Sequence, residues 1–194
     1  MLFGSQPFTS ALVTSNIKLF KYSLVWKKSR PQGFAQAPYR FMTEHEDILV
    51  FSKGGCAKNA TNRMKFNPQN LIYSPRKTKG KKANASEHRI RKTDQKDFIS
   101  EWTNYPRSII ENDSEFNTVH PTQKPVSLLE YLIKTYSDEG DIILDNCIGS
   151  GTTAIACMNT NRNFIGFEMD SKYYEIANKR IKERQIELNQ QLFK

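Results

Sequence analysis

The 194-residue sequence has few of the residues that crosslink small domains or bind metals. Its three cysteines, Cys56, Cys147 and Cys157, show no paired spacing. Such a set provides neither a disulfide framework nor a zinc site, and it fits a protein of the reducing cytoplasm. The three histidines do not cluster either, so we expect no metal site.

Long apolar runs are also missing. No stretch of about 18 apolar residues occurs, so the sequence predicts no membrane span and no membrane partner. The N-terminus lacks a basic region followed by an apolar one, so no signal peptide is predicted. The length is sufficient for one domain with a sizeable core.

Acidic residues are scarce in one part of the chain. Residues 53–92 hold twelve Lys and Arg and a single acid, Glu87, which gives this segment a net charge of +11. The whole chain carries +9, so the remainder carries −2. A basic surplus of this kind favours a polyanionic partner.

The most informative stretch lies between residues 120 and 170. Ile142–Leu144 is a short apolar run that predicts a buried parallel strand, with Asp145 at its carboxyl end. Gly149, Ser150 and Gly151 predict a tight turn, and the following residues predict a helix over Thr152–Met158. A strand, a glycine turn and a helix N-terminus together indicate a nucleotide site, because glycines let the backbone approach the ligand.

A second short apolar strand, Phe164–Phe167, is followed by Glu168. An acidic side chain at this place can accept hydrogen bonds from both hydroxyls of a ribose. The turn also fits the pattern Gly-x-Gly-x-x-Ala, so a dinucleotide site is an alternative. Too few residues follow Glu168 for the second half of a dinucleotide fold, and that fold does not explain the run His120-Pro121-Thr122-Gln123-Lys124-Pro125.

This run, followed by Asp145-x-x-x-Gly149-Ser150-Gly151-Thr152-Thr153, resembles the motifs of the DNA amino-methyltransferases. That family uses S-adenosylmethionine to methylate an exocyclic amine of adenine or cytosine. The order of the motifs is similar to that of its beta group. The usual motif reads Asp-Pro-Phe-x-Gly-Ser-Gly, and here Asn146 and Cys147 replace Pro and Phe. A generic α/β core with a chance match is the alternative.

The resemblance implies an α/β fold: a Rossmann-like methyltransferase sheet with helices on both faces, incomplete at the N-terminus, plus a basic target-recognition insert. It implies strands of the catalytic subregion at 1–53, the insert at 54–116 and the cofactor-binding subregion at 117–194. S-Adenosylmethionine would be held by Asp145, Gly149, Ser150, Gly151, Thr152, Thr153 and Glu168, with Thr122, Lys124 and Pro125 beside its methionine end.

The basic segment lies where the family has its target-recognition region, so we predict that it contacts double-stranded DNA. Lys and Arg would neutralise phosphates, and interleaved polar side chains would read base edges. A solvated basic loop is the alternative. The candidate DNA-binding residues are Arg76, Lys77, Lys79, Lys81, Lys82, Arg89, Arg91 and Lys92.

The family's catalytic tetrapeptide, Asp, Asn or Ser followed by Pro-Pro and an aromatic residue, does not occur in this sequence. Ser5-Gln6-Pro7-Phe8 is nearest, but Gln6 replaces the first Pro. The chain therefore resembles the C-terminal portion of a methyltransferase, either truncated or one piece of a split enzyme with an upstream fragment as partner. The resemblance favours adenine as target. A non-catalytic DNA-binding remnant and an RNA methyltransferase are the alternatives.

The remaining pattern predicts further elements. Helices are expected at Pro7–Ile17, Val126–Tyr136 and Tyr173–Glu187. Strands are expected at the first four residues, at Phe20–Trp26 and at Ile48–Phe51. A loop is expected at Lys27–Tyr39, because this segment contains Pro31, Gly33 and Pro38.

Overall fold

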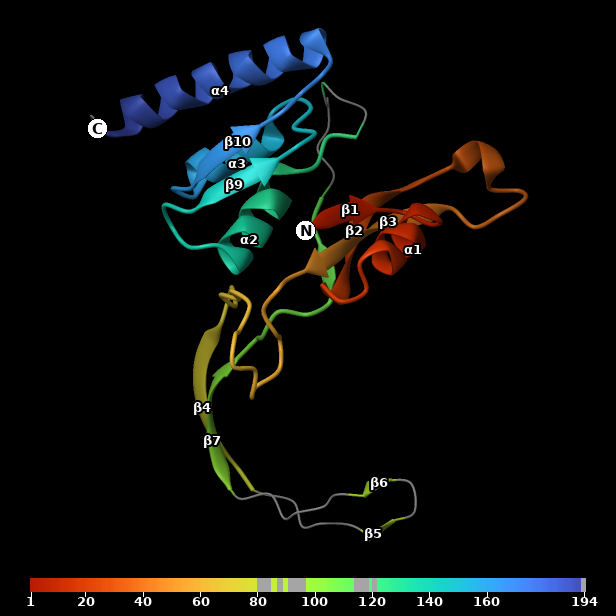
Figure 1. Cartoon of the computed structure of the whole chain (residues 1–194), viewed down its shortest axis with the longest axis vertical. Helices are drawn as coiled ribbons and strands as arrows, with labels where there is room; N and C mark the ends of the chain where they lie inside the picture. Colours follow the sequence, from red (N-terminus) through yellow and green to blue (C-terminus); the bar gives the residue numbers. More distant parts are fainter. Residues whose placement is uncertain (80–84, 87–88, 91–96, 114–118, 120–121, 193–194) are drawn as a thin grey trace. The chain divides into compact units, whose positions relative to one another are not determined.

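The computed structural model describes residues 1–79, 85–86, 89–90, 97–113, 119 and 122–192 (Figure 1). The chain divides into two compact units. Unit 1 comprises Met1–Asn67 and Arg107–Lys194, and unit 2 comprises Pro68–Pro106. Unit 2 lies inside the insert that we expect at 54–116. No helix in the described part of the chain is long and apolar enough to cross a membrane.

Unit 1 contains a four-stranded sheet and a separate two-stranded sheet. The larger sheet has the order β1-β3-β2-β8 and is antiparallel except for the parallel pair of β2 and β8. Alternate residues of the central strands, such as Leu24, Trp26 and Ile48, enter a core cluster. Its strands are β1 (Leu2–Gly4), β2 (Phe20–Gln32), β3 (Thr43–Phe51) and β8 (Ile109–Glu111), and a helix, α1 (Phe8–Ser15), follows β1.

Strand β2 continues six residues beyond the predicted end at Trp26, so the loop prediction for Lys27–Gln32 is wrong. Pro31 is compatible with a strand here because β2 and β3 have a break in their pairing between Lys27 and Gln32, where no ladder hydrogen bond is needed from its nitrogen. The turn after β2 contains a short 3-10 helix, η1 (Phe34–Gln36).

The smaller sheet carries the predicted glycine motif. Strands β9 (Ile142–Asp145) and β10 (Asn163–Gly166) pair in parallel, with Gly166 opposite Asp145. Helix α3 (Thr152–Asn159) connects them, and α4 (Ser171–Leu192) follows β10. This strand–helix–strand unit confirms the expected parallel connection.

Helix α2 (Val126–Tyr136) joins the two sheets of unit 1. Leu128 and Leu132 pack into the core of the larger sheet, whereas Leu129 and Ile133 pack with α3 and with residues of β9 and β10. These four positions form two adjacent stripes of one helix surface, since residues four apart lie on the same face. One helix therefore supports both sheets.

Strands β1 and β9 each lie at the edge of their sheet. Among the described residues, β1 pairs only with β3, and β9 pairs only with β10. Ile142 and Leu144 of β9 are 64% and 65% exposed, so the prediction of a buried strand is wrong for these side chains. The reason is that only Ile143 of β9 packs against the core of α2 and α3.

Unit 2 is built from two antiparallel strand pairs. Strands β4 (Ile72–Thr78) and β7 (Phe98–Thr103) form one pair, and the short β5 (Ala85–Ser86) and β6 (Arg89–Ile90) form the other. Tyr73 and Trp102 lie on opposite strands with their rings in edge-to-face contact at 5.2 Å between centroids. Such cross-strand aromatic pairs stabilise a hairpin that has little core of its own.

Candidate functional site

The glycine turn is held at the carboxyl end of β9. Gly149 and Gly151 have φ angles of +56° and +84°. Residues that have a Cβ rarely adopt this left-handed region of the backbone. A Cβ on Gly151 would also come within 3.0 Å of Ala177 of α4. Asp145 fixes both ends of the turn, because its carboxylate accepts hydrogen bonds from the Cys147 backbone nitrogen at 3.0 Å and from the Thr153 hydroxyl at 2.5 Å.

Glu168 lies on the opposite side of the same turn. Its Oε2 accepts a hydrogen bond from the Gly149 nitrogen at 2.8 Å, and its Oε1 accepts one from the Asp170 nitrogen at 2.9 Å. The backbone N–H groups, that of Asp170 first and that of Gly149 after it, lower the pKa of the Glu168 carboxyl. The carboxylate therefore stays ionised and keeps lone pairs for a further donor.

The structure brings together the two motifs that are separated in the sequence. The Ser150 hydroxyl donates a hydrogen bond to Gln123 Oε1 at 3.0 Å, and it accepts one from the Arg180 guanidinium, also at 3.0 Å. Arg180 also donates to the Ser150 carbonyl at 2.7 Å. Ser150 is 2% exposed, so these contacts fix the turn from the side of the 122–125 segment and from α4.

Lys124 points away from the turn and towards the larger sheet. Its ammonium lies 2.7 Å from Glu46, and Lys28 lies 3.2 Å from the other oxygen of the same carboxylate. Both ammonium groups also lie over the ring of Trp26, at 5.8 and 5.1 Å from its centroid. Two cations thus share one largely buried anion, which leaves a net positive charge beside the indole.

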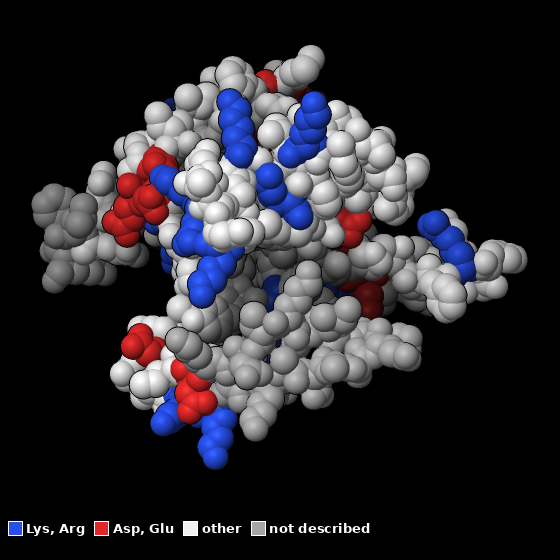
Figure 2. All heavy atoms as spheres, turned by 60° about the horizontal axis from the view of Figure 1, so that its bottom comes forward, with Lys and Arg blue, Asp and Glu red and all other residues white. Residues whose placement is uncertain are grey.

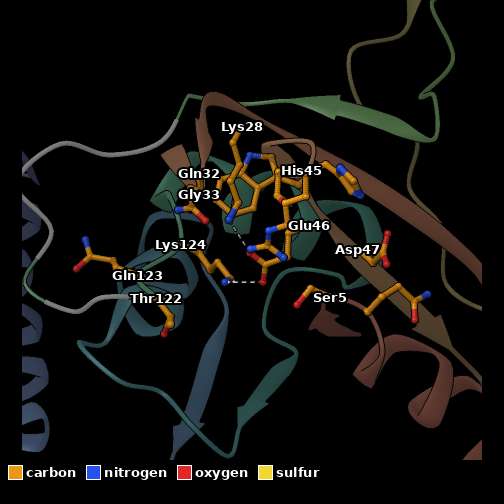
Figure 3. A pocket seen from close by; sticks show the side chains of 14 residues that line it. Ser5, Lys28, Gln32, Gly33, His45, Glu46, Asp47, Thr122, Gln123 and Lys124 are labelled. Atoms are coloured by element: carbon orange, nitrogen blue, oxygen red, sulfur yellow. Dashed lines mark hydrogen bonds and ion pairs between the residues drawn. The ribbon is translucent and has the colours of Figure 1, made fainter. Parts of the chain in front are cut away.

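These residues line a pocket of about 780 Å³ in unit 1 (Figure 3). Figure 3 shows Glu46 between Lys28 and Lys124, with Thr122 and Gln123 on one side and Ser5 on the other. Polar and charged side chains dominate the wall. The pocket also includes Gln6, so the Ser5-Gln6-Pro7-Phe8 sequence borders it although it lacks the family tetrapeptide.

The remaining cofactor candidates lie close to these groups along the chain. Thr152 is buried and begins α3, directly after Gly151. Pro125 is fully buried at the N-terminus of α2. Thr122 lines the pocket, whereas His120 and Pro121 lie outside the described residues.

The DNA-binding candidates lie on or after β4 in unit 2. Arg76 and Lys77 are exposed residues of β4, and Lys79 is exposed just beyond it. Arg89 belongs to β6. Lys81, Lys82, Arg91 and Lys92 lie outside the described residues.

Part of the basic segment belongs to unit 1 and is already paired. Lys65 lies 2.8 Å from Asp138 and 2.6 Å from Asp141, and Asn67 donates to the Ser137 carbonyl at the end of α2. The hydrogen bonds with Lys65 lower the pKa values of both aspartates. These contacts attach residues 65–67 to α2, so a count of positive charge over 53–92 overstates the surface available to a polyanion.

A family model described as "DNA methylase" matches residues 8–179. The type II methyltransferase M1.MboII of Moraxella bovis is 31% identical over 186 residues, which cover 89% of this chain and 68% of that protein. The chain belongs to the DNA methylase family. Another member, M.HpaI of Haemophilus parainfluenzae, is 47% identical over 62 residues, which cover 32% of this chain and 20% of that protein.

Solved structures of this family have the same fold. The M1.HpyAVI–SAM complex is 27% identical with a TM-score of 0.59, and the match covers 92% of this chain and 71% of that one. The cytosine-N4-specific PvuII DNA methyltransferase is 15% identical with a TM-score of 0.57, and the match covers 91% and 61%. These likenesses confirm the predicted Rossmann-like methyltransferase architecture.

Several residues of the site escaped the sequence analysis. Gln123 lies in the run at 120–125, but the sequence analysis gave it no role. Arg180, Glu46 and Lys28 also make contacts in the site, and none of these three stands in a spacing typical of a binding site. The alternation of β2 and β3 offered one signal: it places Trp26 opposite Glu46, with Lys28 on the same face of β2 as Trp26.

Proposed function

We propose that this chain is part of an S-adenosylmethionine-dependent DNA methyltransferase that modifies the exocyclic amine of adenine in double-stranded DNA. The arrangement of Asp145 and Glu168 carries the proposal. Asp145 ends one of two adjacent parallel strands and Glu168 follows the other, and both acids accept hydrogen bonds from the turn that precedes α3. Ligands of open α/β sheets bind at this edge, outside the carboxyl ends of the strands.

The residues of the turn fit the cofactor. Both oxygens of Glu168 are oriented by backbone N–H groups, and each has a second lone pair that suits a ribose hydroxyl. Gly149 and Gly151 leave the backbone open to a ligand where a Cβ would be strained. Asp145, Ser150, Thr152 and Thr153 complete the set. S-Adenosylmethionine would supply the activated methyl group.

Binding measurements test this proposal directly. Isothermal titration of the chain with S-adenosylmethionine should give saturable binding, and titration with NAD should give none. The NAD titration is informative because Gly149-x-Gly151-x-x-Ala154 also fits a dinucleotide pattern. Binding of NAD without binding of S-adenosylmethionine would contradict the proposal.

Adenine is proposed as the target on the resemblance to the family, and no single residue of the chain carries this preference. The fold alone does not discriminate, since a cytosine-N4-specific enzyme shares it. The deciding assay is mass spectrometry of nucleosides from DNA methylated by the complete enzyme. N6-methyladenine is expected, and N4-methylcytosine would reassign the target.

We further infer that methyl transfer needs a catalytic segment from another polypeptide or from a longer form of this chain. Two observations support this inference. The catalytic tetrapeptide is missing from the sequence, and within the described residues β1 and β9 are each paired on one side only. The missing tetrapeptide equally supports the second candidate, a DNA-binding remnant that does no chemistry. Restored transfer with an added catalytic segment distinguishes the two.

A further inference from the structure

A long hairpin projects from the larger sheet of unit 1. We define the arm as residues 27–43, which include the end of β2, η1 and the start of β3. The strand β8 accompanies β2 only over Val25–Lys27, so the arm extends beyond this neighbour (Figure 1). Pairing of Gln32 with Thr43 closes its outer part.

The tip of the arm has a defined backbone. Gln36 donates to the Gly33 carbonyl at 3.0 Å, and Tyr39 and Arg40 both donate to the Gln36 carbonyl, at 2.9 and 3.0 Å. Gly33, with φ of +90°, permits the turn that begins this series. The tip is thus preorganised, and a ligand that binds there need not order it first.

Three aromatic side chains at the tip lie almost entirely in solvent. Phe34 is 82% exposed, Tyr39 is 89% exposed and Phe41 is 99% exposed. Aromatic rings of this size normally contribute to a core, so a cluster of three exposed rings within eight residues indicates a binding surface. None of the three contributes to either core cluster of unit 1.

The charge of the arm has a single sign. Residues 27–43 contain four Lys and Arg and no Asp or Glu. Lys27 and Lys28 pair with Glu111 and Glu46, which lie outside the arm, and Arg30 and Arg40 are exposed on it. The lobe that projects at the right of Figure 2 shows Lys or Arg and no Asp or Glu at its outer end.

Exposed rings between basic side chains match the chemistry of unpaired nucleotides. Bases stack on aromatic faces without regard to sequence, and Lys and Arg neutralise the adjoining phosphates. The arm also forms one wall of the 780 Å³ pocket, through Gln32, Gly33 and Arg40. A nucleotide strand held at the tip would therefore pass beside this polar pocket.

We propose that the arm is a second DNA-contacting surface, separate from the one predicted in unit 2, and that it stacks on bases that are out of the duplex. This inference deepens the proposed function and rests on it. An enzyme that modifies a base must take that base out of the stack. The arm supplies a place where an exposed base or its unpaired partner can stack.

The test uses fluorescence anisotropy with the full chain and three labelled probes: a closed duplex, the same duplex with one central base unpaired, and a single strand. The arm variant is Phe34→Ala with Tyr39→Ala and Phe41→Ala. The matched control is Tyr174→Ala with Ile186→Ala, since both side chains are 57% exposed on α4. Thermal unfolding of each variant checks that the fold is kept.

The arm variant should bind the unpaired and single-stranded probes at least about fivefold more weakly, which corresponds to the loss of one base–aromatic stack. The closed duplex should lose less, and the control should lose nothing. Arg30→Gln with Arg40→Gln should reduce the slope of log affinity against log salt by about 0.7 for each single-strand phosphate that is no longer neutralised.

A parallel variant separates this inference from the proposed function. Arg76→Gln with Lys77→Gln and Lys79→Gln alters unit 2 only. If this variant weakens duplex binding while the arm variant binds all three probes like wild type, the arm inference is overturned and the proposed function stands. If the wild-type chain binds neither DNA nor S-adenosylmethionine, the proposed function is overturned and the arm inference with it.

Discussion

Glu168 has the most sharply defined role of any single residue in the proposed site. Its carboxylate is oriented by two backbone N–H groups and remains available to a ligand. Glu168→Ala should weaken S-adenosylmethionine binding by about 1.5–3 kcal/mol for each charge-assisted hydrogen bond that is removed. Isothermal titration measures this change. Glu183→Ala, an exposed acid on α4, is the control, and equal effects of the two substitutions would remove Glu168 from the site.

The ionisation of Glu168 also predicts a pH profile. The backbone N–H groups of Asp170 and Gly149 lower its pKa below the ordinary value of 4.5. A carboxyl whose pKa is lowered in the folded state contributes stability above its unfolded pKa and loses it as the pH falls through the folded pKa. Cofactor affinity should therefore be independent of this group above pH 4.5 and fall only below it. A decline centred near neutral pH would implicate a different residue.

Gln123 connects the 122–125 segment to the glycine turn through Ser150. Gln123→Ala would leave the buried Ser150 hydroxyl without its acceptor, although Arg180 would still donate to it. The expected loss is about 0.5–1.5 kcal/mol of stability, the net value of a neutral hydrogen bond, accompanied by weaker cofactor binding. Thermal unfolding and titration of this variant and of Gln185→Ala, an exposed glutamine on α4, provide the comparison. A loss of the same size in both would remove the special role of Gln123.

At the scale of elements, α2 supports both sheets of unit 1. Leu132 is 1% exposed and packs into the core of the larger sheet. Leu132→Ala should destabilise the chain by about 2–5 kcal/mol through reduced burial and the cavity left behind. Lys134→Ala, an exposed position of the same helix, should have little effect. Chemical denaturation measures both, and comparable unfolding midpoints would contradict the role given to α2.

The sequence predicted α2 with the same bounds as the structure because its apolar residues recur with helical spacing and depend on no other element. The glycine turn was equally predictable, since only glycines suit its positive φ angles. The length of β2 was not, because Pro31 normally interrupts a strand and the pairing break that accommodates it depends on β3. The contact of Gln123 with Ser150 joins residues 27 apart, and no local pattern encodes such a pair.

The hairpin of unit 2 should determine how DNA affinity responds to salt. Arg76, Lys77 and Lys79 are exposed on or just after β4. Replacing all three with Gln should flatten the plot of log affinity against log salt by about 0.9 for each duplex phosphate that is no longer neutralised. Lys172→Gln with Lys179→Gln and Lys182→Gln, three exposed lysines of α4, is the charge-matched control. An unchanged slope in the unit 2 variant would place the duplex-binding surface elsewhere.

At the scale of the molecule, we expect the strand edges of β1 and β9 that have no partner among the described residues to determine behaviour in solution. Unpaired strand edges invite pairing with other chains, and the exposed Ile142 and Leu144 add apolar surface on the face of β9 opposite Ile143. We predict that the 194 residues alone transfer no methyl group and tend to self-associate. Light scattering and incorporation of tritiated methyl groups into unmethylated DNA measure the two properties.

Adding the portion of M1.MboII that the match leaves out, in trans or fused to this chain, should reduce self-association and restore transfer together. Restored solubility without transfer would favour the non-catalytic remnant. Robust incorporation by the 194 residues alone would contradict the prediction, and it would direct attention to Ser5-Gln6-Pro7-Phe8 at the pocket wall.

Unit 2 is one continuous segment of the chain that begins at Pro68 and ends at Pro106. A genetic exchange confined to these codons would replace one surface and leave the packing of α2, the glycine turn and Glu168 untouched. If unit 2 contacts DNA as we propose, the DNA specificity would then change in a single recombination event, without a series of compensating mutations in the core. Unit 2 is therefore a segment that can be exchanged as a whole. Chimaeras joined near Pro68 and Pro106 should keep the cofactor affinity of the parent that supplies unit 1.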